Sequence, residues 1–313
     1  MSRNYLHLTG GLGNQLFQWS ALVATGSDKS FVIDIRNGEP RKAPNGKPDL
    51  LAFDLPANVD TIERKMPELT RKSVGFTLRS HIDPKSWEKL PFVLLAVRMI
   101  TSILISAHFR RLIIVRVALG LGHDTNFRVG RGNNFLIGYF QSAIWTQSIY
   151  SNHLLSLRLL EDTEQVRRYR GLSKLEQPLI VHVRLGDYLS EGSLGIPSEN
   201  YYHDAIYKQI ASGIYRKIWL FSDEPKKALD ILPKNLPLDI RVIEHIGVTS
   251  AETLEIMRLG YGYVIANSTF SWWGAYLSYF KNPKVIFPIP WFRFLQDPAG
   301  LTPTEWEGMN AQY

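Results

Sequence analysis

The second half of the chain alternates short apolar runs that are typical of strands with amphipathic runs that are typical of helices. Strand-like runs lie at residues 179–184, 217–222, 240–244, 262–267 and 284–287, and helix-like runs lie between them at 200–211, 225–231, 251–259 and 271–280. This alternation predicts a doubly wound parallel sheet. Ligands of such sheets bind at the carboxyl ends of the strands. The residues that follow each strand are therefore the first candidates for a functional site.

The first half of the chain opens with a strand, a glycine-rich turn and a helix. These elements are expected at Tyr5–Leu8, Gly10–Gly13 and from Leu16 onward. A second strand is expected at residues 31–35, whereas residues 49–85 show no pattern that assigns an element.

Length and composition limit the class of protein. A chain of 313 residues predicts two domains at roughly 150 residues per domain, and we place them at residues 1–172 and 173–313. The chain has no cysteine, which excludes disulfides and thiolate metal sites and favours a reducing compartment. The N-terminus runs directly into the first strand without a signal segment, so we expect a cytoplasmic protein.

The net charge of +7 is concentrated in one segment. Residues 85–131 hold eight basic side chains against two acidic ones, a net charge of +6. Within this segment Arg98, Ser102, Ser106 and Arg110 recur every four residues and form one stripe of a helix. Two interpretations are open: a pair of core helices with a solvated face, or a basic amphipathic helix on an anionic membrane surface. No uninterrupted apolar run here approaches the roughly 18–20 residues that span a bilayer.

The end of the strand at residues 179–184 carries a candidate phosphate contact. Arg184 is followed by a glycine turn, and an arginine at the rim of a parallel sheet is suited to bidentate binding of phosphate. A rim salt bridge between Arg184 and Asp187 is an equally good interpretation. His182 projects to the same face of an extended strand as Arg184, either as a ligand contact or as a satisfied core residue.

A second candidate is the turn at residues 267–271, which links a strand to a helix. The hydroxyl groups and backbone amides of such a turn lie at a helix N-terminus, where unpaired N–H groups and the helix dipole attract anions. Simple N-capping of the helix is the alternative. The side chains in question are Asn267, Ser268, Thr269, Phe270 and Ser271.

Two weaker signals complete the predicted site. Ser222 and Asp223 follow a strand and either accept a hydrogen bond from a ribose or base or cap the helix that opens at Pro225. The loop with Gly11 and Gly13 lacks the third glycine of the dinucleotide fingerprint, but it opens a helix and allows close approach of an anionic group. No Asp, Glu or His cluster has the spacing of a zinc site. Together these features indicate a nucleotide-diphosphate site without a protein-held metal.

Five ordered blocks of the chain carry a family resemblance. They are Gly10–Gln18 (GGLGNQLFQ), Gly138–Ser142 (GYFQS), His182–Tyr188 (HVRLGDY), Phe221–Asp223 (FSD) and Ala266–Ala275 (ANSTFSWWGA). In these blocks the chain resembles glycosyltransferase family 11, the α-1,2-fucosyltransferases. The resemblance implies an α/β fold of the GT-B type, with two Rossmann-like domains that face each other across a cleft. It also implies a GDP-L-fucose donor, inversion at the anomeric carbon and no essential metal or other cofactor.

The resemblance assigns roles to individual residues. Donor binding is implied for Gly11, Gly13, His182, Ser222, Asp223, Asn267, Ser268, Thr269, Phe270 and Ser271, catalysis for Arg184, Asp187 and Asn14, and an acceptor contact for Gln141. Asp187 is either the general base or the residue that positions Arg184. The wider fucosyltransferase group, which includes the protein O-fucosyltransferases, has an arginine in the glycine loop where Gly11 stands here. The chain departs from the family pattern at Thr253, where an aspartate is usual, and at Ala143, where a charged residue is usual.

The activity implied is transfer of L-fucose from GDP-β-L-fucose to a galactose hydroxyl in α-1,2 linkage. The expected acceptor is a galactose-terminated, lipid-linked intermediate of a bacterial surface polysaccharide such as O-antigen. Domain 1–172 would be the acceptor side and domain 173–313 the GDP-fucose side. The alternatives are another sugar nucleotide as donor, or a catalytically silent protein that binds a sugar nucleotide or glycan. A nucleic-acid partner is disfavoured because basic and aromatic residues are not interleaved on a strand-like face. Segment 85–131 would hold the enzyme peripherally on the inner membrane.

Overall fold

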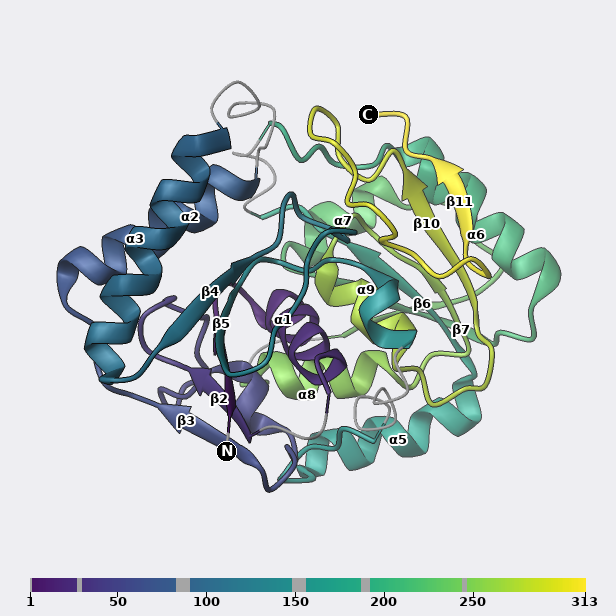
Figure 1. Cartoon of the computed structure of the whole chain (residues 1–313). Coiled ribbons are helices and arrows are strands. Elements are labelled where there is room, and N and C mark those ends of the chain that lie inside the picture. Colours follow the sequence, from purple (N-terminus) through teal and green to yellow (C-terminus); the bar gives the residue numbers. More distant parts are fainter. Residues whose placement is uncertain (1, 27–29, 83–90, 148–155, 187–191, 244–246) are drawn as a thin grey trace. The chain divides into compact units, whose positions relative to one another are not determined.

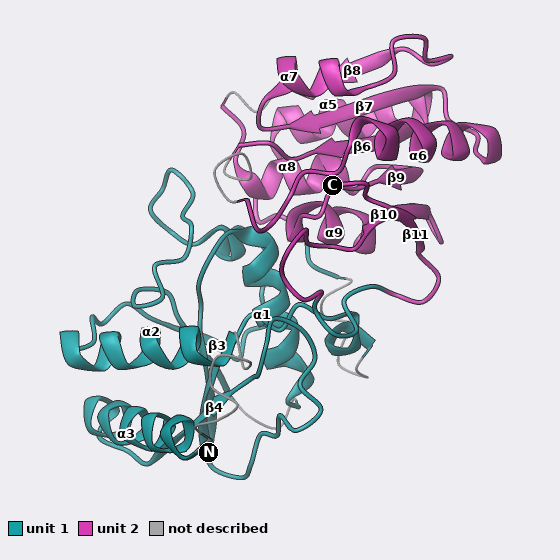
Figure 2. Cartoon of the chain, turned by 90° about the horizontal axis from the view of Figure 1, so that it is seen from above, with its two compact units in different colours: residues 1–158, 298–302 teal, residues 159–297, 303–313 magenta. Residues whose placement is uncertain are grey.

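A computed structural model describes residues 2–26, 30–82, 91–147, 156–186, 192–243 and 247–313 (Figure 1). The chain forms two compact units, which are coloured separately in Figure 2. Unit 1 comprises residues 1–158 and 298–302, and unit 2 comprises residues 159–297 and 303–313. Each unit is built on its own parallel sheet with helices packed against it, which confirms the two α/β units expected from the sequence.

The boundary between the units differs from the predicted division at residues 172 and 173, which falls inside helix α5 (Glu164–Glu176). This helix packs on unit 2, where the rings of Tyr169 and Trp219 lie 5.3 Å apart. Near the other end of the chain, residues 298–302 return to unit 1. There the Gly300 carbonyl accepts hydrogen bonds from Ser142 Oγ and from the Ala143 amide, both at 2.8 Å. The returning segment is too short to leave a compositional signal in the sequence.

Unit 1 contains a five-stranded parallel sheet in the order β3-β2-β1-β5-β4. Its strands are β1 (Arg3–His7), β2 (Ser30–Asp34), β3 (Val59–Ile62), β4 (Ile113–Val117) and β5 (Asn133–Ile137). Its helices are α1 (Leu12–Ala24), α2 (Glu68–Ile82) and α3 (Pro91–Phe109), with short 3-10 helices η1 (Asp49–Ala52) and η3 (Ala143–Gln147). The order of the strands reverses between β1 and β5, which makes the carboxyl ends of these two strands a switch point.

Helices cover both faces of the unit 1 sheet, as alternation along β2 shows. Phe31 contacts Trp19 of α1, with ring centroids 6.0 Å apart. The next residue, Val32, faces the opposite way. It belongs to the apolar cluster that α2 and α3 form with the sheet, which includes Leu78 and Ile105. Figure 1 shows α2 and α3 side by side along this unit.

The serines of the polar stripe of α3 face the protein, whereas Arg110 after the helix is exposed. Of the two interpretations left open by the sequence, the one in which this stripe forms a solvated face is wrong for Ser102 and Ser106. Ser102 Oγ accepts a hydrogen bond from the Val115 amide at 3.1 Å, and Ser106 Oγ accepts one from the Ile113 amide at 3.0 Å. These amides belong to β4, an edge strand, whose outward N–H groups need partners. The serines of α3 supply them, so the apolar side chains of the helix turn outward.

Among the described residues, α3 is the helix whose length and composition suffice to cross a bilayer. Over Phe92–Phe109 its mean hydropathy is 1.9, and only 17% of this window is buried. Arg98 is the single charged residue in the window.

Unit 2 contains a six-stranded parallel sheet in the order β11-β10-β9-β6-β7-β8. Its strands are β6 (Pro178–Val183), β7 (Lys217–Ser222), β8 (Ile240–Val242), β9 (Gly262–Val264), β10 (Lys284–Ile289) and β11 (Glu307–Asn310). Its helices after α5 are α6 (Glu199–Ser212), α7 (Pro225–Ile231), α8 (Ser250–Met257) and α9 (Thr269–Tyr276). The predicted alternation of strands and helices is confirmed, and β11 is a strand that the pattern did not indicate.

The core of unit 2 explains why its strands read as continuous apolar runs. All six residues of β6 are buried, because helices cover the sheet on both sides. On one face Val181 and Leu220 pack with α6 and α7. On the other face Trp219 meets α5 through Tyr169.

Candidate functional site

The strand order of unit 2 fixes where a ligand would bind. Counted along the chain from β6, the sheet has the order 3-2-1-4-5-6, with the reversal between β6 and β9. This is the order of dinucleotide-binding sheets, whose ligands lie outside the carboxyl ends of the strands at the reversal. Val181 of β6 pairs with Val264 of β9, so the two strands end side by side. The predicted segments at residues 182–186 and 267–271 therefore meet at one edge of the sheet.

Arg184 is held at this edge by Asp223. The two side chains form an ion pair of 3.0 Å between Arg184 Nη1 and Asp223 Oδ2, with about a quarter of each side chain exposed, 26% and 24%. Asp223 Oδ1 accepts a second hydrogen bond, from the Leu185 amide at 3.0 Å. The carboxylate predicted to contact a nucleotide thus fixes the arginine that is predicted to bind phosphate.

Gly186 is required for this arrangement. A Cβ atom at residue 186 would lie 2.3 Å from Asp223 Oδ2, which is too close for any real contact. Asp187, the alternative partner of Arg184 and the candidate base, lies outside the described residues.

His182 connects the end of β6 with the start of α9. Its ring lies 6.4 Å from the ring of Phe270, and the side chain of His182 is buried. The Tyr202 hydroxyl donates to the His182 carbonyl at 3.2 Å. Helix α6 therefore fixes the backbone directly before Arg184, while the imidazole faces the turn at the start of α9.

The turn from Asn267 to Ser271 is built as a helix N-terminus. Ser268 is the N-cap of α9, and its Oγ accepts from the Phe270 amide at 3.3 Å. Ser271 Oγ donates to the Ser268 carbonyl at 3.2 Å. Asn267 Nδ2 donates to the carbonyls of Leu194 and Gly195, at 3.1 and 3.0 Å. Asn267 therefore anchors a neighbouring loop, and Thr269 and Phe270 are the partly exposed residues of the turn.

Two side chains near the unit 2 site have structural partners. Ser222 Oγ accepts from the Glu224 amide at 3.1 Å, within the turn before α7. The N-cap residue of α7 is Glu224, which makes no side-chain capping bond, so Ser222 does not cap this helix. Glu252 stands beside Thr253, where the family resemblance leads us to expect an aspartate. Its Oε2 accepts from the amide and the hydroxyl of Thr249, both at 2.7 Å, in a capping box at the start of α8.

The glycine-rich loop of unit 1 is held by the glutamines of its own motif. Gln15 Nε2 donates to the carbonyls of Gly10 and Arg41, at 2.9 and 3.0 Å. Gln18 Oε1 accepts from the Thr9 amide at 3.0 Å. Gly11 is the N-cap of α1 with φ −76°, and its Cβ position meets no atom within 4 Å. These hydrogen bonds fix the backbone of the loop and leave open space at the Cβ position of Gly11.

Asn14 and Gln141 meet at the switch point of unit 1. Gln141 Nε2 donates to Asn14 Oδ1 at 3.1 Å, which joins the first turn of α1 to the segment after β5. Gln141 Oε1 is buried and has no hydrogen-bond partner among the described residues. A buried amide oxygen of this kind is a strong acceptor for a ligand hydroxyl group.

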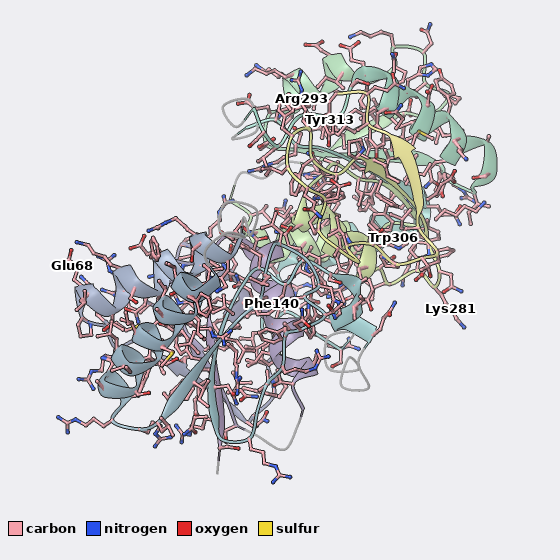
Figure 3. The ribbon with its side chains drawn as sticks, turned by 45° about the horizontal axis from the view of Figure 1, so that its top comes forward. Glu68, Phe140, Lys281, Arg293, Trp306 and Tyr313 are labelled. Atoms are coloured by element: carbon pink, nitrogen blue, oxygen red, sulfur yellow. The ribbon has the colours of Figure 1, made fainter. Side chains whose placement is uncertain are left out.

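Phe140, labelled in Figure 3, directly precedes Gln141 in the segment after β5. Its φ of +55° is in the left-handed region that bulky side chains rarely adopt. Packing of the Phe140 ring offsets the cost of this backbone conformation. Its centroid lies 5.2 Å from that of Phe127 and 5.9 Å from that of Trp145. Strain of this kind persists where the surrounding structure imposes it, often at functional sites.

A buried pair that was not predicted from the sequence lies at the same edge of unit 1. His7 ends β1 and Asp34 ends β2, and their Nδ1 and Oδ2 atoms lie 3.5 Å apart. Burial by itself would raise the pKa of Asp34, but the neighbouring His7 and the hydrogen bonds from Asn37 outweigh burial and lower it. The sequence offered one signal for this pair, because Asp34 is a charged residue near the end of the predicted strand 31–35.

The described residues include no group of three or more His, Cys, Asp or Glu side chains that could hold a metal ion. At the unit 2 edge the structure places a fixed guanidinium and a helix N-terminus after neighbouring strands of the sheet. Both features attract the negative charge of a diphosphate.

Comparison with known proteins supplies the family context. The family model described as Glycosyl transferase family 11 matches residues 108–310. The O-antigen biosynthesis glycosyltransferase WbnK of Escherichia coli is 26% identical over 308 residues, which cover 92% of this chain and 94% of that protein. The alpha-1,2-colitosyltransferase of Escherichia coli is 34% identical over 122 residues, which cover 36% of this chain and 40% of that protein.

Solved structures resemble the chain more distantly. POFUT1 in complex with GDP superimposes with a TM-score of 0.49 at 12% identity, over 91% of this chain and 98% of that chain. The fucosyltransferase NodZ from Bradyrhizobium superimposes with a TM-score of 0.46 at 15% identity, over 88% of this chain and 92% of that chain.

Proposed function

Because the chain belongs to glycosyl transferase family 11, we propose that it transfers L-fucose from GDP-β-L-fucose to a galactose hydroxyl in α-1,2 linkage. The observation that carries this proposal is the edge of unit 2 between β6 and β9, where Arg184 is fixed by Asp223 beside the N-terminus of α9. A guanidinium and a helix N-terminus together suit a diphosphate leaving group.

The proposed reaction is a single displacement. The acceptor oxygen forms a bond to C1 of fucose while the bond from C1 to the β-phosphate oxygen breaks, and the configuration inverts from β to α. GDP leaves with the electron pair, and Arg184 and the start of α9 stabilise its growing negative charge. The acceptor hydroxyl loses its proton to a general base, for which Asp187 is our candidate.

Unit 1 is proposed as the acceptor side. Asn14 and Gln141 present amide groups at its switch point, and amides are suited to the hydroxyl groups of a sugar. The name of the relative WbnK supports a surface glycan of the O-antigen type as acceptor. We propose a galactose-terminated, lipid-linked intermediate.

Incubation with GDP-fucose and a panel of galactosides, followed by NMR assignment of the new linkage, tests the proposal. We expect an α-1,2-fucosyl product, formed equally well in the presence of EDTA. A product with another linkage or anomeric configuration would refute it. If no galactoside is a substrate, donor hydrolysis still distinguishes an enzyme from a silent binding protein.

A colitosyl donor is the second candidate, and the alpha-1,2-colitosyltransferase relative favours it. Colitose is L-fucose without the 3-hydroxyl group, so both sugars present the same reacting carbon. Competition among GDP-fucose, GDP-colitose, GDP-mannose and UDP-sugars for one enzyme preparation ranks the donors by kcat/KM. A site that hydrogen-bonds the 3-hydroxyl group rejects colitose strongly, whereas a site that leaves it in solvent accepts both sugars.

A further inference from the structure

The outward face of α3 is apolar. Its most exposed apolar side chains recur at intervals of three or four residues from Phe92 to Ile103, with Ile100 next to Met99. They are Phe92, Leu95, Met99, Ile100 and Ile103, each exposed by 46% or more. A surface helix of a soluble protein normally has the opposite arrangement, with its apolar stripe against the core.

Hydrogen bonds on the inward face fix this orientation. Thr101 Oγ1 lies 2.7 Å from Ser73 Oγ and 2.9 Å from Thr77 Oγ1, both on α2. Ser102 and Ser106 of α3 also accept hydrogen bonds from the outward amides of the edge strand β4. Rotation of α3 to bury its apolar side chains would break all of these hydrogen bonds. The exposure of the apolar face is therefore fixed by the fold.

The charged residues of α3 and of the segment that follows it are all basic. Residues 91–123 contain no aspartate or glutamate. Arg110 and Arg111 are exposed directly after the last residue of α3. On the neighbouring helix α2, Phe76 and Arg79 are exposed as well. An apolar stripe that is followed by two exposed cations complements an anionic lipid surface.

We propose that the outward face of α3 docks the enzyme on an anionic membrane. The apolar side chains enter the boundary between headgroups and acyl chains, and Arg110 and Arg111 contact lipid phosphates. The helix lies along the surface and does not span the bilayer, because the side of α3 with Thr101, Ser102 and Ser106 is bonded to the protein. The proposal develops the membrane-surface interpretation of segment 85–131, and the structure adds that the serines of α3 face the protein.

A site-specific probe tests where the lipid binds. The chain has no cysteine, so Met99→Cys provides a single attachment point for an environment-sensitive fluorophore on α3. Leu175→Cys on α5 is the matched control, because Leu175 is also an exposed apolar residue on a helix. Vesicles of phosphatidylglycerol and phosphatidylcholine should shift the Met99→Cys emission to the blue and leave the control unchanged. Equal shifts at both positions, or none at either, would overturn the proposal.

Co-sedimentation with the same vesicles measures the strength of binding. The double variant Met99→Gln and Ile103→Gln should bind about tenfold more weakly, since two inserted apolar side chains are lost. Leu175→Gln should bind like the wild type. The double variant Arg110→Gln and Arg111→Gln should weaken binding to anionic vesicles and flatten its salt dependence. Unchanged binding of the Met99 and Ile103 variant would overturn the proposal.

A second copy of the chain is the competing occupant of this face. Light scattering during gel filtration distinguishes it from lipid. A wild-type monomer that sediments with vesicles supports membrane docking. A wild-type dimer that becomes monomeric in the Met99→Gln and Ile103→Gln variant, without vesicle binding, assigns the face to self-association and refutes our proposal.

Discussion

The guanidinium of Arg184 lies 3.0 Å from the carboxylate of Asp223, and the other oxygen of that carboxylate holds the Leu185 amide. Asp223 therefore uses both oxygens to fix the segment after β6. An arginine held in this way loses less conformational entropy when it binds a phosphate group, which is the basis of preorganised charge stabilisation.

Replacement of Arg184 by alanine should lower kcat/KM for the sugar-nucleotide donor by about 10²–10³, the size expected for loss of one well-placed donor. Steady-state kinetics with a varied donor provide the measurement. Lys281→Ala is the matched control, because Lys281 is an exposed cation of the same unit that lies away from this segment in the sequence. A folded Arg184→Ala protein with near-normal turnover would exclude the assigned role.

Asp223→Asn should act through Arg184. The amide keeps an oxygen for the Leu185 amide but loses the charge that holds the guanidinium, so we expect a loss of about tenfold in kcat/KM. The double variant with Arg184→Ala should be no worse than Arg184→Ala alone, because the two residues act as a unit. Additive losses would instead show that Asp223 contacts the nucleotide independently.

Asn14→Ala should lower kcat by about tenfold to a hundredfold at saturating donor, because a misplaced acceptor reacts slowly. Its amide accepts from Gln141, so Gln141→Ala should have a similar effect and the double variant should be less than additive. A coupling of about 1 kcal/mol is the size of one such hydrogen bond. Calorimetric titration should show unchanged donor binding in both variants, and a large loss of donor affinity would contradict the acceptor role.

The fold of unit 2 could be predicted because burial on both faces leaves a strong pattern. The strand 217–222 and the helix 225–231 were predicted with the bounds that the structure gives. In contrast, β11 (Glu307–Asn310) has no apolar run, because it is an edge strand with mostly exposed side chains. The alternation of strands and helices in the sequence identifies the residues that follow each strand. It does not encode the order of the strands in the sheet, which is a property of the tertiary structure.

Unit 1 was less predictable, and the reasons are specific. Strand β3 (Val59–Ile62) is an edge strand with a mixed burial pattern, so periodicity does not distinguish it from a loop. For helix α3 we applied the usual rule that polar residues face water. The rule fails here because the unpaired amides of edge strand β4 donate hydrogen bonds to the serines of the helix. The pairing of Asn14 with Gln141 joins segments far apart in the sequence, which no local pattern can reveal.

Gly10→Ala should disturb the acceptor side through the backbone. Gly10 has φ +74°, and a Cβ atom there would lie 2.8 Å from Asn14 Nδ2. We expect a loss of about 1–2 kcal/mol in the free energy of unfolding, together with the lower kcat expected for a displaced Asn14. Thermal unfolding and acceptor kinetics provide the two measurements.

Gly75→Ala is the control for this substitution within unit 1. Gly75 lies inside α2, and its Cβ position is at 3.5 Å from the flexible end of Arg79, an ordinary contact. Alanine in a helix interior should stabilise the protein by about 0.5–1 kcal/mol without an effect on kcat. Equal stability losses in the two variants would show that positive φ and the Asn14 contact are not what makes Gly10 necessary.

The stability of unit 2 should depend on pH through Glu176, at the end of α5. Its Oε2 accepts from Arg241 Nε at 2.9 Å and from Trp219 Nε1 at 2.7 Å, which ties the helix to β8 and β7. The hydrogen bond from Arg241 is the main cause that lowers the pKa of Glu176 below its usual value. The folded state therefore favours the carboxylate, so this stabilisation is complete above pH ~4.5 and is lost as the pH falls through the lowered pKa.

Glu176→Gln should lower the free energy of unfolding by about 1–2 kcal/mol at pH 7, because Arg241 loses its charged partner while Trp219 keeps an acceptor. The difference from the wild type should shrink below pH ~4.5, where the wild-type carboxylate itself becomes protonated. Urea unfolding between pH 7 and pH 3 measures both effects. Glu68→Gln, which removes the exposed partner of Lys72, should change stability by at most about 0.5 kcal/mol. A difference between Glu176→Gln and the wild type that grows as the pH falls would contradict a lowered pKa, because protonation of the wild-type carboxylate should make the two proteins alike.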